Sequence, residues 1–170
     1  MNQAIFITGF NNWGKTTIIQ NLFSGQTRFS YGHPYSIPGI NTQFTVESHS
    51  NDDYIGNAWV QRIDDRMRAA HPNAQNLFTA LCPSMEKDNR FIDLLKKPVF
   101  GDFNILYLFL IEYKWEHHTK LIVQNIAREA SKLPAIKVIR INADANEENE
   151  ELRLKIKLNQ INGELVKIFN

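Results

Sequence analysis

Short strand-like apolar runs alternate along this chain with segments whose apolar residues recur every three or four positions. Each run is bounded by polar or turn-forming residues, as is typical of buried strands. The runs stand at 4–8, 43–47, 77–81, 105–111 and 136–141. Because helical patterns separate them, we predict an α/β domain with a three-layer αβα arrangement around a mostly parallel five-stranded sheet.

The segments between these runs place their apolar residues on one side of a helix. Trp59, Ile63 and Met67, for example, form a single stripe that would pack on the sheet. The helices predicted from this spacing cover 17–24, 57–70 and 120–133.

The last segment carries two competing patterns. Apolar and charged residues alternate over 152–158, which is typical of a strand, whereas the spacing over 154–168 is helical. We favour one helix over 145–169, because Glu, Leu and Lys dominate it and because Asp144 followed by Glu147 resembles a capping box.

The segment 25–42 shows neither pattern. Between residues 25 and 39 it holds three glycines and two prolines, so we expect a long loop or a flap that closes over substrate. Phe29, Tyr31 and Tyr35 would then either line a pocket or form a small core beneath the loop.

Composition limits the class of protein. With 170 residues, 43% of them hydrophobic and 22% charged, the chain suits a single domain over 1–170. The net charge of +1 provides no general attraction to nucleic acid or to an acidic membrane, so neither partner is predicted.

Two features bear on the compartment. Cys82 is the sole cysteine and cannot form an internal disulfide, which agrees with a reducing compartment. No signal peptide is visible, and the longest apolar run, 105–111, is too short to span a bilayer. We therefore expect a cytoplasmic protein.

The first run leads into a stretch that fits the phosphate-binding pattern GxxxxGK[ST], with a strand before it and a helix after it. Between the two glycines the backbone curls so that amide N–H groups face phosphate oxygens, and the helix N-terminus adds partial positive charge. Lys15 would reach the β- and γ-phosphates, and the Thr16 hydroxyl would ligate Mg²⁺. The residues expected to contact the nucleotide are Gly9, Phe10, Asn11, Asn12, Trp13, Gly14, Lys15, Thr16 and Thr17.

A phosphate loop alone does not distinguish kinases from GTPases and ATPases. Phosphoryl transfer depends on positioning and charge neutralisation, so a second acidic group is expected near Mg²⁺ or near the attacking hydroxyl. Asn51-Asp52-Asp53 is the best candidate, because it follows the second strand at its carboxyl end, where open α/β sheets bind ligands. A polar turn is the alternative interpretation of these residues.

The whole layout resembles the small P-loop kinases of the nucleoside-monophosphate, shikimate, gluconate and adenylylsulfate kinase type, within the P-loop NTPase superfamily. The triplet 51–53 resembles the acidic motif that such enzymes carry after their second strand, which implies that Asp52 or Asp53 is the base or a magnesium ligand. Residues 77–84 and Arg90 resemble the strand and substrate-contacting turn of the adenylylsulfate and gluconate kinases. Arg90 would then contact the acceptor.

The resemblance extends to the last predicted strand. Residues 136–144 resemble the strand and loop that often flank the adenine, which implies that Asn142 and Ala143 lie beside the base. Taken together, the resemblance implies a P-loop fold and a Mg²⁺-dependent ATP phosphotransferase that acts on a small hydroxyl- or phosphate-bearing acceptor.

The chain departs from this family in its lid. Such kinases usually close an arginine-bearing lid over the phosphates after the fourth strand, which screens charge in the transition state. Here 112–133 offers Lys114, Lys120 and Arg128, with no arginine pair. Lys114 or Arg128 could substitute, but Arg128 is equally suited to the solvated face of a helix.

A Ras-like GTPase or switch, with GTP in place of ATP, is the alternative interpretation. Tyr113-Lys114-Trp115-Glu116 stands where such proteins carry Asn-Lys-x-Asp, and Asn142-Ala143 stands where they carry Ser-Ala. Asp53-Tyr54-Ile55-Gly56 spells DxxG, and Thr42 could be the switch threonine. However, Tyr and Glu replace the Asn and Asp that recognise guanine, which weakens the hydrogen bonds to the base.

A non-catalytic nucleotide-binding module that regulates a protein partner is the third interpretation. Strand order separates the first two. A parallel sheet in which the second and third strands flank the phosphate-loop strand on one side would support the kinase layout, whereas an antiparallel second strand would favour the GTPase.

Overall fold

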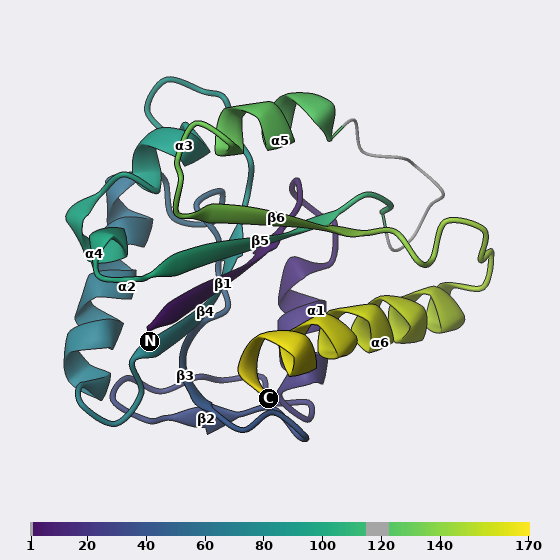
Figure 1. Ribbon diagram of the computed structural model, residues 1–170, viewed down its shortest axis with the longest axis horizontal. Coiled ribbons are helices and arrows are strands. Elements are labelled where there is room, and N and C mark those ends of the chain that lie inside the picture. Colours follow the sequence, from purple (N-terminus) through teal and green to yellow (C-terminus); the bar gives the residue numbers. More distant parts are fainter. Residues whose placement is uncertain (1, 115–122) are drawn as a thin grey trace.

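Six strands form one mixed sheet in the computed structural model, which describes residues 2–114 and 123–170 (Figure 1). They are β1 (Gln3–Thr8), β2 (Tyr35–Ser36), β3 (Gln43–Glu47), β4 (Asn76–Leu81), β5 (Ile105–Ile111) and β6 (Ile136–Ile141). Their order across the sheet is β2-β3-β4-β1-β5-β6. β2 is antiparallel to β3, and the other neighbouring strands are parallel. The α/β class and the mostly parallel sheet are confirmed, but the sheet has six strands, not five.

The central strand β1 is buried on both faces, which explains why it appears in the sequence as a continuous apolar run. Its side chains point alternately into two cores, as the pleat of a strand requires. Ala4 and Phe6 belong to one core, and Ile5 and Ile7 belong to the other. All four are fully buried.

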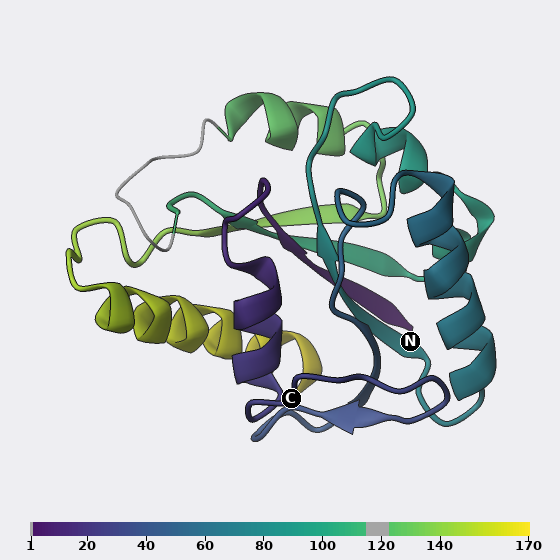
Figure 2. The ribbon, with the colours of Figure 1, turned by 180° about the vertical axis from the view of Figure 1, so that it is seen from behind.

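Helices cover both faces of the sheet (Figures 1 and 2). α1 (Lys15–Leu22) and α6 (Glu150–Phe169) contribute apolar side chains to one core. The opposite core receives those of α2 (Asn57–Ala70), α3 (Phe91–Leu94), α4 (Pro98–Gly101) and α5 (Gln124–Ala130). Within the two described ranges, none of these helices combines the length and apolar character needed to cross a bilayer.

The helix boundaries correct the sequence prediction in several places. α1 begins at Lys15, earlier than predicted, because the phosphate loop turns directly into the helix. α5 covers only the later part of 120–133, and residues 115–122 lie outside the described chain. The short helices α3 and α4 were not predicted, because four residues are too few to show a helical period.

The C-terminal helix begins at Glu150 instead of 145, with Asn149 as its cap. The Asn149 Oδ1 accepts a hydrogen bond from the Leu152 N–H at 3.0 Å. Asp144, the predicted cap, is fully buried and lies 2.9 Å from Lys157 Nζ. Burial lowers the pKa of Lys157 against the opposing effect of Asp144. The Asp144 carboxylate therefore holds the turn after β6 against α6 and does not cap the helix.

The segment 25–42 is a long loop with the short strand β2. Phe29 is buried, and its ring packs edge-on against Phe23 and Tyr35, with centroid distances of 5.6 and 5.0 Å. The structure therefore supports the small core beneath the loop for Phe29 and Tyr35. Tyr31 is exposed and contacts the guanidinium of Arg66.

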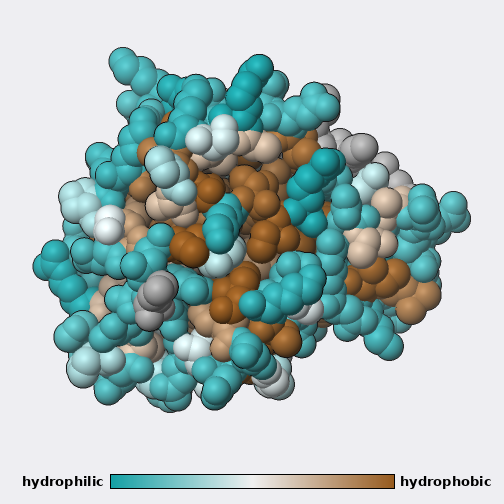
Figure 3. All heavy atoms as spheres, in the orientation of Figure 1, coloured by the Kyte–Doolittle hydropathy of each residue, from teal (hydrophilic) through white to brown (hydrophobic). Residues whose placement is uncertain are grey.

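Apolar side chains gather in the middle of the face drawn in Figure 3, over the edge strand β6 of Figure 1. Ile136, Val138 and Ile139 of this strand are only half-buried. Lys137 and Arg140 are exposed on the same strand, and charged residues at such positions hinder pairing with the edge of another sheet.

Glu47, the last residue of β3, holds α2 to the sheet from a fully buried position. Its Oε2 accepts a hydrogen bond from Arg66 Nε at 2.7 Å and lies 3.1 Å from Arg62 Nη2, while its Oε1 accepts one from the His49 N–H at 3.0 Å. Burial raises the pKa of this carboxyl, but the His49 hydrogen bond and the Arg66 charge outweigh burial and hold it below its ordinary value.

We expect Glu47→Gln to destabilise the protein at neutral pH and to weaken the acid dependence of stability. Because the folded-state pKa is lowered, the ionised carboxylate contributes stability that is present above its ordinary pKa of 4.5 and is lost as the pH falls through the folded-state value. In urea unfolding at pH 7 the variant should lose about 3 kcal/mol, since Arg66 remains buried without its partner.

Glu164→Gln is the matched control, because Glu164 pairs with Lys167 on the surface of α6. It should change the free energy of unfolding by less than about 0.5 kcal/mol. The role assigned to Glu47 would be wrong if the deficit of Glu47→Gln stayed the same size on acidification.

Candidate functional site

The loop from Gly9 to Gly14 leaves the carboxyl end of β1 and turns into α1 through left-handed backbone positions. Asn12 has φ of 59° and Gly14 has φ of 78°. The Gly9 N–H donates to the Leu81 carbonyl at 3.1 Å, which fixes the start of the loop to β4. Gly14 occupies the N-cap of α1 and has no side chain that could satisfy the first N–H groups. The first turn therefore offers N–H donors and partial positive charge to an anion.

Lys15 folds back over this loop. Its Nζ donates to the Phe10 carbonyl at 3.0 Å and to Asp52 Oδ2 at 3.3 Å. The side chain is only 6% exposed. The next residue also contacts the segment after β3, because Thr16 Oγ1 donates to the Ser48 carbonyl at 3.2 Å. Both side chains predicted to hold the triphosphate and Mg²⁺ thus lie beside the acidic segment.

The two acidic candidates have different surroundings. Asp52 is half-buried, and it contacts Lys15 through Oδ2 and the Ser50 hydroxyl through Oδ1. Asp53 is exposed, and its Oδ2 accepts from the Ser50 N–H at 2.8 Å, which closes a turn. Asp52 therefore faces Lys15, and Asp53 closes the polar turn, while a catalytic or magnesium-binding role for either stays a prediction.

Asn51 fixes the acidic segment across the end of β4. It is fully buried, its Nδ2 donates to the Cys82 carbonyl at 3.1 Å, and its Oδ1 accepts from the Cys82 N–H at 2.7 Å. Its Nδ2 also donates to Asn89 Oδ1 at 3.0 Å. Sequence reasoning did not assign this role, because an asparagine beside two aspartates is typical of an exposed turn.

The loop that leads into α1 and the acidic segment after β3 line a cavity of about 250 Å³. A larger cavity of about 690 Å³ lies where β1 and β4 begin, between α2 and α4, and none of the phosphate-loop residues lines it. The smaller cavity is lined by Asn11, Asn12, Trp13, Gly14, Lys15, Thr16, Thr17, Ser50, Asp52 and Asp53. Most of the predicted phosphate-loop contacts and both acidic candidates are therefore brought together.

The residues around this cavity fit a magnesium ion. A threonine hydroxyl and one or two carboxylates are hard oxygen ligands, and Mg²⁺ usually combines such ligands with water and substrate phosphates. Thr16, Asp52 and Asp53 supply these groups from one cavity. In the described ranges there is no group of three or more His, Cys, Asp or Glu side chains that could hold a metal alone. Water molecules or phosphate oxygens would complete the coordination of such an ion.

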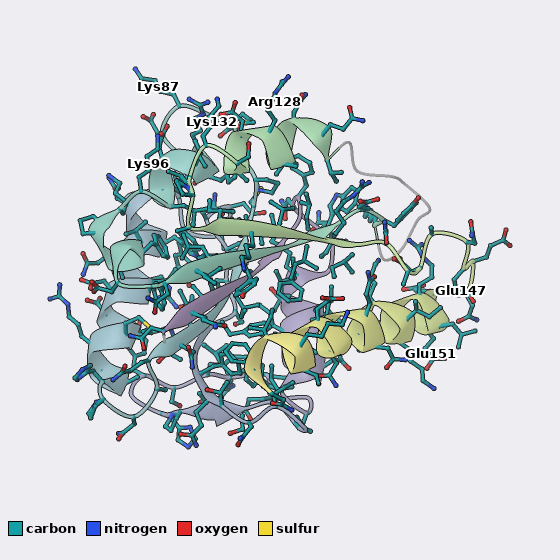
Figure 4. The ribbon with its side chains drawn as sticks, viewed as in Figure 1. Lys87, Lys96, Arg128, Lys132, Glu147 and Glu151 are labelled. Carbon is teal, nitrogen blue, oxygen red and sulfur yellow. The ribbon has the colours of Figure 1, made fainter. Side chains whose placement is uncertain are left out.

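Arg90 is not brought to the cavity. Its Nη2 donates to Glu129 Oε2 at 2.8 Å, which joins the residue before α3 to α5. Arg128, a candidate lid residue, points away from the molecule on α5 (Figure 4), and its Nη2 donates to Asn125 Oδ1 at 2.9 Å. The solvated interpretation of Arg128 therefore holds, while Lys120 lies outside the described residues.

Asn142 and Ala143 also lie outside the cavity lining. Their backbone N–H groups donate to Gln160 Oε1 at 3.0 and 2.9 Å, so α6 holds the turn after β6. Their place beside a base stays a prediction. Trp115 and Glu116 of the guanine-like motif fall outside the described part of the chain.

No protein-family model matches the chain, and no curated protein matches it in sequence. Its function must therefore be inferred from the chemistry of the cavity.

We expect Cys82 to react slowly with thiol reagents in the folded protein. Burial raises the pKa of this thiol to about 11 from an ordinary 9.0, and the Asp52 charge adds to the rise. Since the thiolate is the reactive form, labelling at pH 8 should be at least about 100-fold slower than in urea. A disulfide reagent that releases a coloured thiolate would measure the labelling rate in the folded protein and in urea. Comparable rates would contradict the burial of Cys82.

Proposed function

We propose that this chain binds a nucleoside triphosphate with Mg²⁺ at the loop 9–17 and transfers its terminal phosphoryl group, from ATP, to a small hydroxyl- or phosphate-bearing acceptor. One observation carries the proposal. Lys15, Thr16 and Asp52 come from two separate segments and converge on one cavity at the N-terminus of α1. A cationic side chain, a hydroxyl, a carboxylate and free helix N–H groups are the set that phosphoryl transfer uses.

The strand order supports a kinase layout over a Ras-like one. β4 and β3 follow β1 on one side of the sheet, and all three are parallel. The antiparallel strand β2 is a two-residue addition at the edge and not the predicted second strand. These are the features expected of a small P-loop kinase, and we propose that fold for the chain.

Each residue at the cavity would have a distinct task. Lys15 and the loop N–H groups bind the phosphates, since their charge and hydrogen bonds match the negative oxygens. Thr16 and Asp52 would hold Mg²⁺, which neutralises phosphate charge when bound. Asp52 would also orient an acceptor hydroxyl, which the contact of Asp53 with its own turn supports.

Arg90 would contact the acceptor only after its ion pair with Glu129 breaks. Residues 112–133 also lack the arginine pair that the lids of small P-loop kinases carry. Stabilisation of the negative charge in the transition state would therefore depend mainly on Lys15 and the metal, and we expect slow turnover. A cytosolic setting, where ATP and reduced thiols occur, suits such an enzyme with a single buried cysteine.

We expect Lys15→Ala to remove triphosphate binding. Among the described residues that line the cavity, Lys15 is the only positive side chain, so its loss should weaken binding of Mg²⁺-ATP by about 100-fold or more in calorimetric titration. Lys155→Ala is the matched control, because Lys155 is exposed on α6 and lies outside this cavity. Unchanged affinity in Lys15→Ala would show that the loop is not the binding site.

The choice of nucleotide separates the kinase from the switch. We expect calorimetric titration with ATP, GTP and their non-hydrolysable analogues to show a Mg²⁺-dependent preference for ATP, and negligible release of diphosphate without an acceptor. GTP preference with slow release would contradict the kinase proposal and indicate a switch. Tight binding of either nucleotide with no transfer to any acceptor would indicate a regulatory module.

A further inference from the structure

The segment from Ser48 to Asp52 occupies both phosphate-loop side chains that a bound nucleotide would need. Asp52 Oδ2 lies 3.3 Å from Lys15 Nζ, and the Ser48 carbonyl accepts a hydrogen bond from Thr16 Oγ1 at 3.2 Å. Both partners are oxygen atoms, one of a carboxylate and one of a backbone carbonyl. They occupy the positions beside Lys15 and Thr16 that phosphate oxygens and a metal ion would take in a complex. A ligand must compete with this segment for Lys15 and Thr16.

The charges around the cavity act against a bare anion. Lys15 is opposed there by two carboxylates, those of Asp52 and Asp53, so the lining residues that the structure describes carry a net charge of −1. The N-terminus of α1 adds only about half a positive charge. A metal-free triphosphate therefore meets a cavity in which Lys15 is already paired and the two carboxylates among the described lining residues repel the anion.

A divalent cation reverses both effects. It offers the carboxylate of Asp52 a partner other than Lys15, and it neutralises part of the phosphate charge. Asp52 is suited to such an exchange because its side chain is 16% exposed, whereas Glu47, the last residue of β3, is fully buried beside Arg62 and Arg66. Asn51 holds the backbone of the segment in place while the carboxylate changes partner.

We propose that Asp52 makes this cavity selective for the magnesium complex of a triphosphate over the metal-free anion, by holding Lys15 until a cation releases it. Asp52 is thus a specificity-determining residue as well as a metal ligand. The inference rests on the proposed function, because it assumes that the loop binds polyphosphate.

Inorganic tripolyphosphate is the probe, because it tests the phosphate site without assuming which base the protein prefers. Calorimetric titration in excess Mg²⁺ and in excess chelator gives two affinities, and their ratio is the magnesium effect. In the wild-type protein this ratio should exceed about 100. In Asp52→Asn the affinity in chelator should rise by about tenfold, since Lys15 no longer gives up a charge-assisted hydrogen bond on binding. The affinity in Mg²⁺ should fall, since a metal ligand is lost.

Asp53→Asn is the matched control. This substitution changes the charge of the cavity by the same amount as Asp52→Asn. However, the carboxylate that it removes contacts the Ser50 N–H and not Lys15. Its affinity in chelator should rise by no more than about threefold, the part due to charge alone. Circular dichroism of both variants should match the wild-type spectrum, which shows that the fold is retained.

Two outcomes would overturn the inference, and they are distinguishable from failure of the proposed function. If Asp52→Asn and Asp53→Asn bound tripolyphosphate equally in chelator, or if neither gained affinity, Asp52 would not be holding Lys15. If the wild-type protein bound tripolyphosphate in neither condition, the loop would not be a phosphate site, and both proposals would fail.

Discussion

The parallel pairing of β3, β4, β1 and β5 decides where chemistry can occur in this molecule. Parallel strands end at the same edge of a sheet, so the loops that follow them meet there, however far apart they lie in the sequence. β1 lies between β4 and β5 and is parallel to both, so its carboxyl end emerges between the ends of these two strands. The loop 9–14, the N-terminus of α1 and the acidic segment are brought together by this constraint.

A second requirement follows from the strand order. β4 lies between β1 and β3, so the acidic segment has to cross the end of β4 before it reaches the phosphate loop. The crossing buries polar backbone that water no longer satisfies. Asn51 resolves this by exchanging hydrogen bonds with the backbone N–H and carbonyl of Cys82. A residue without catalytic chemistry thus sets the position of the carboxylate beside Lys15.

Two carboxylates that follow each other closely in the chain serve opposite purposes because their burial differs. Glu47 is enclosed with Arg66, and removing either partner would strand a charge in the interior. The Asp52 side chain is 16% exposed and lies 3.3 Å from Lys15, so this ion pair is less enclosed than that of Glu47. The first interaction holds α2 to the sheet, while the second joins the segment after β3 to Lys15 at the cavity.

The sequence by itself determined the five main strands, the α/β class and the phosphate-loop motif, because apolar periodicity and a glycine-bounded GK[ST] stretch are local signals. Only the tertiary structure decided that Asp52, and not Asp53, faces Lys15, that Arg90 pairs with Glu129, and that Asp144 is buried against α6. Neighbouring residues in a turn point in directions that no periodic pattern encodes. Their partners are chosen by strand order and packing, which depend on segments distant in the chain.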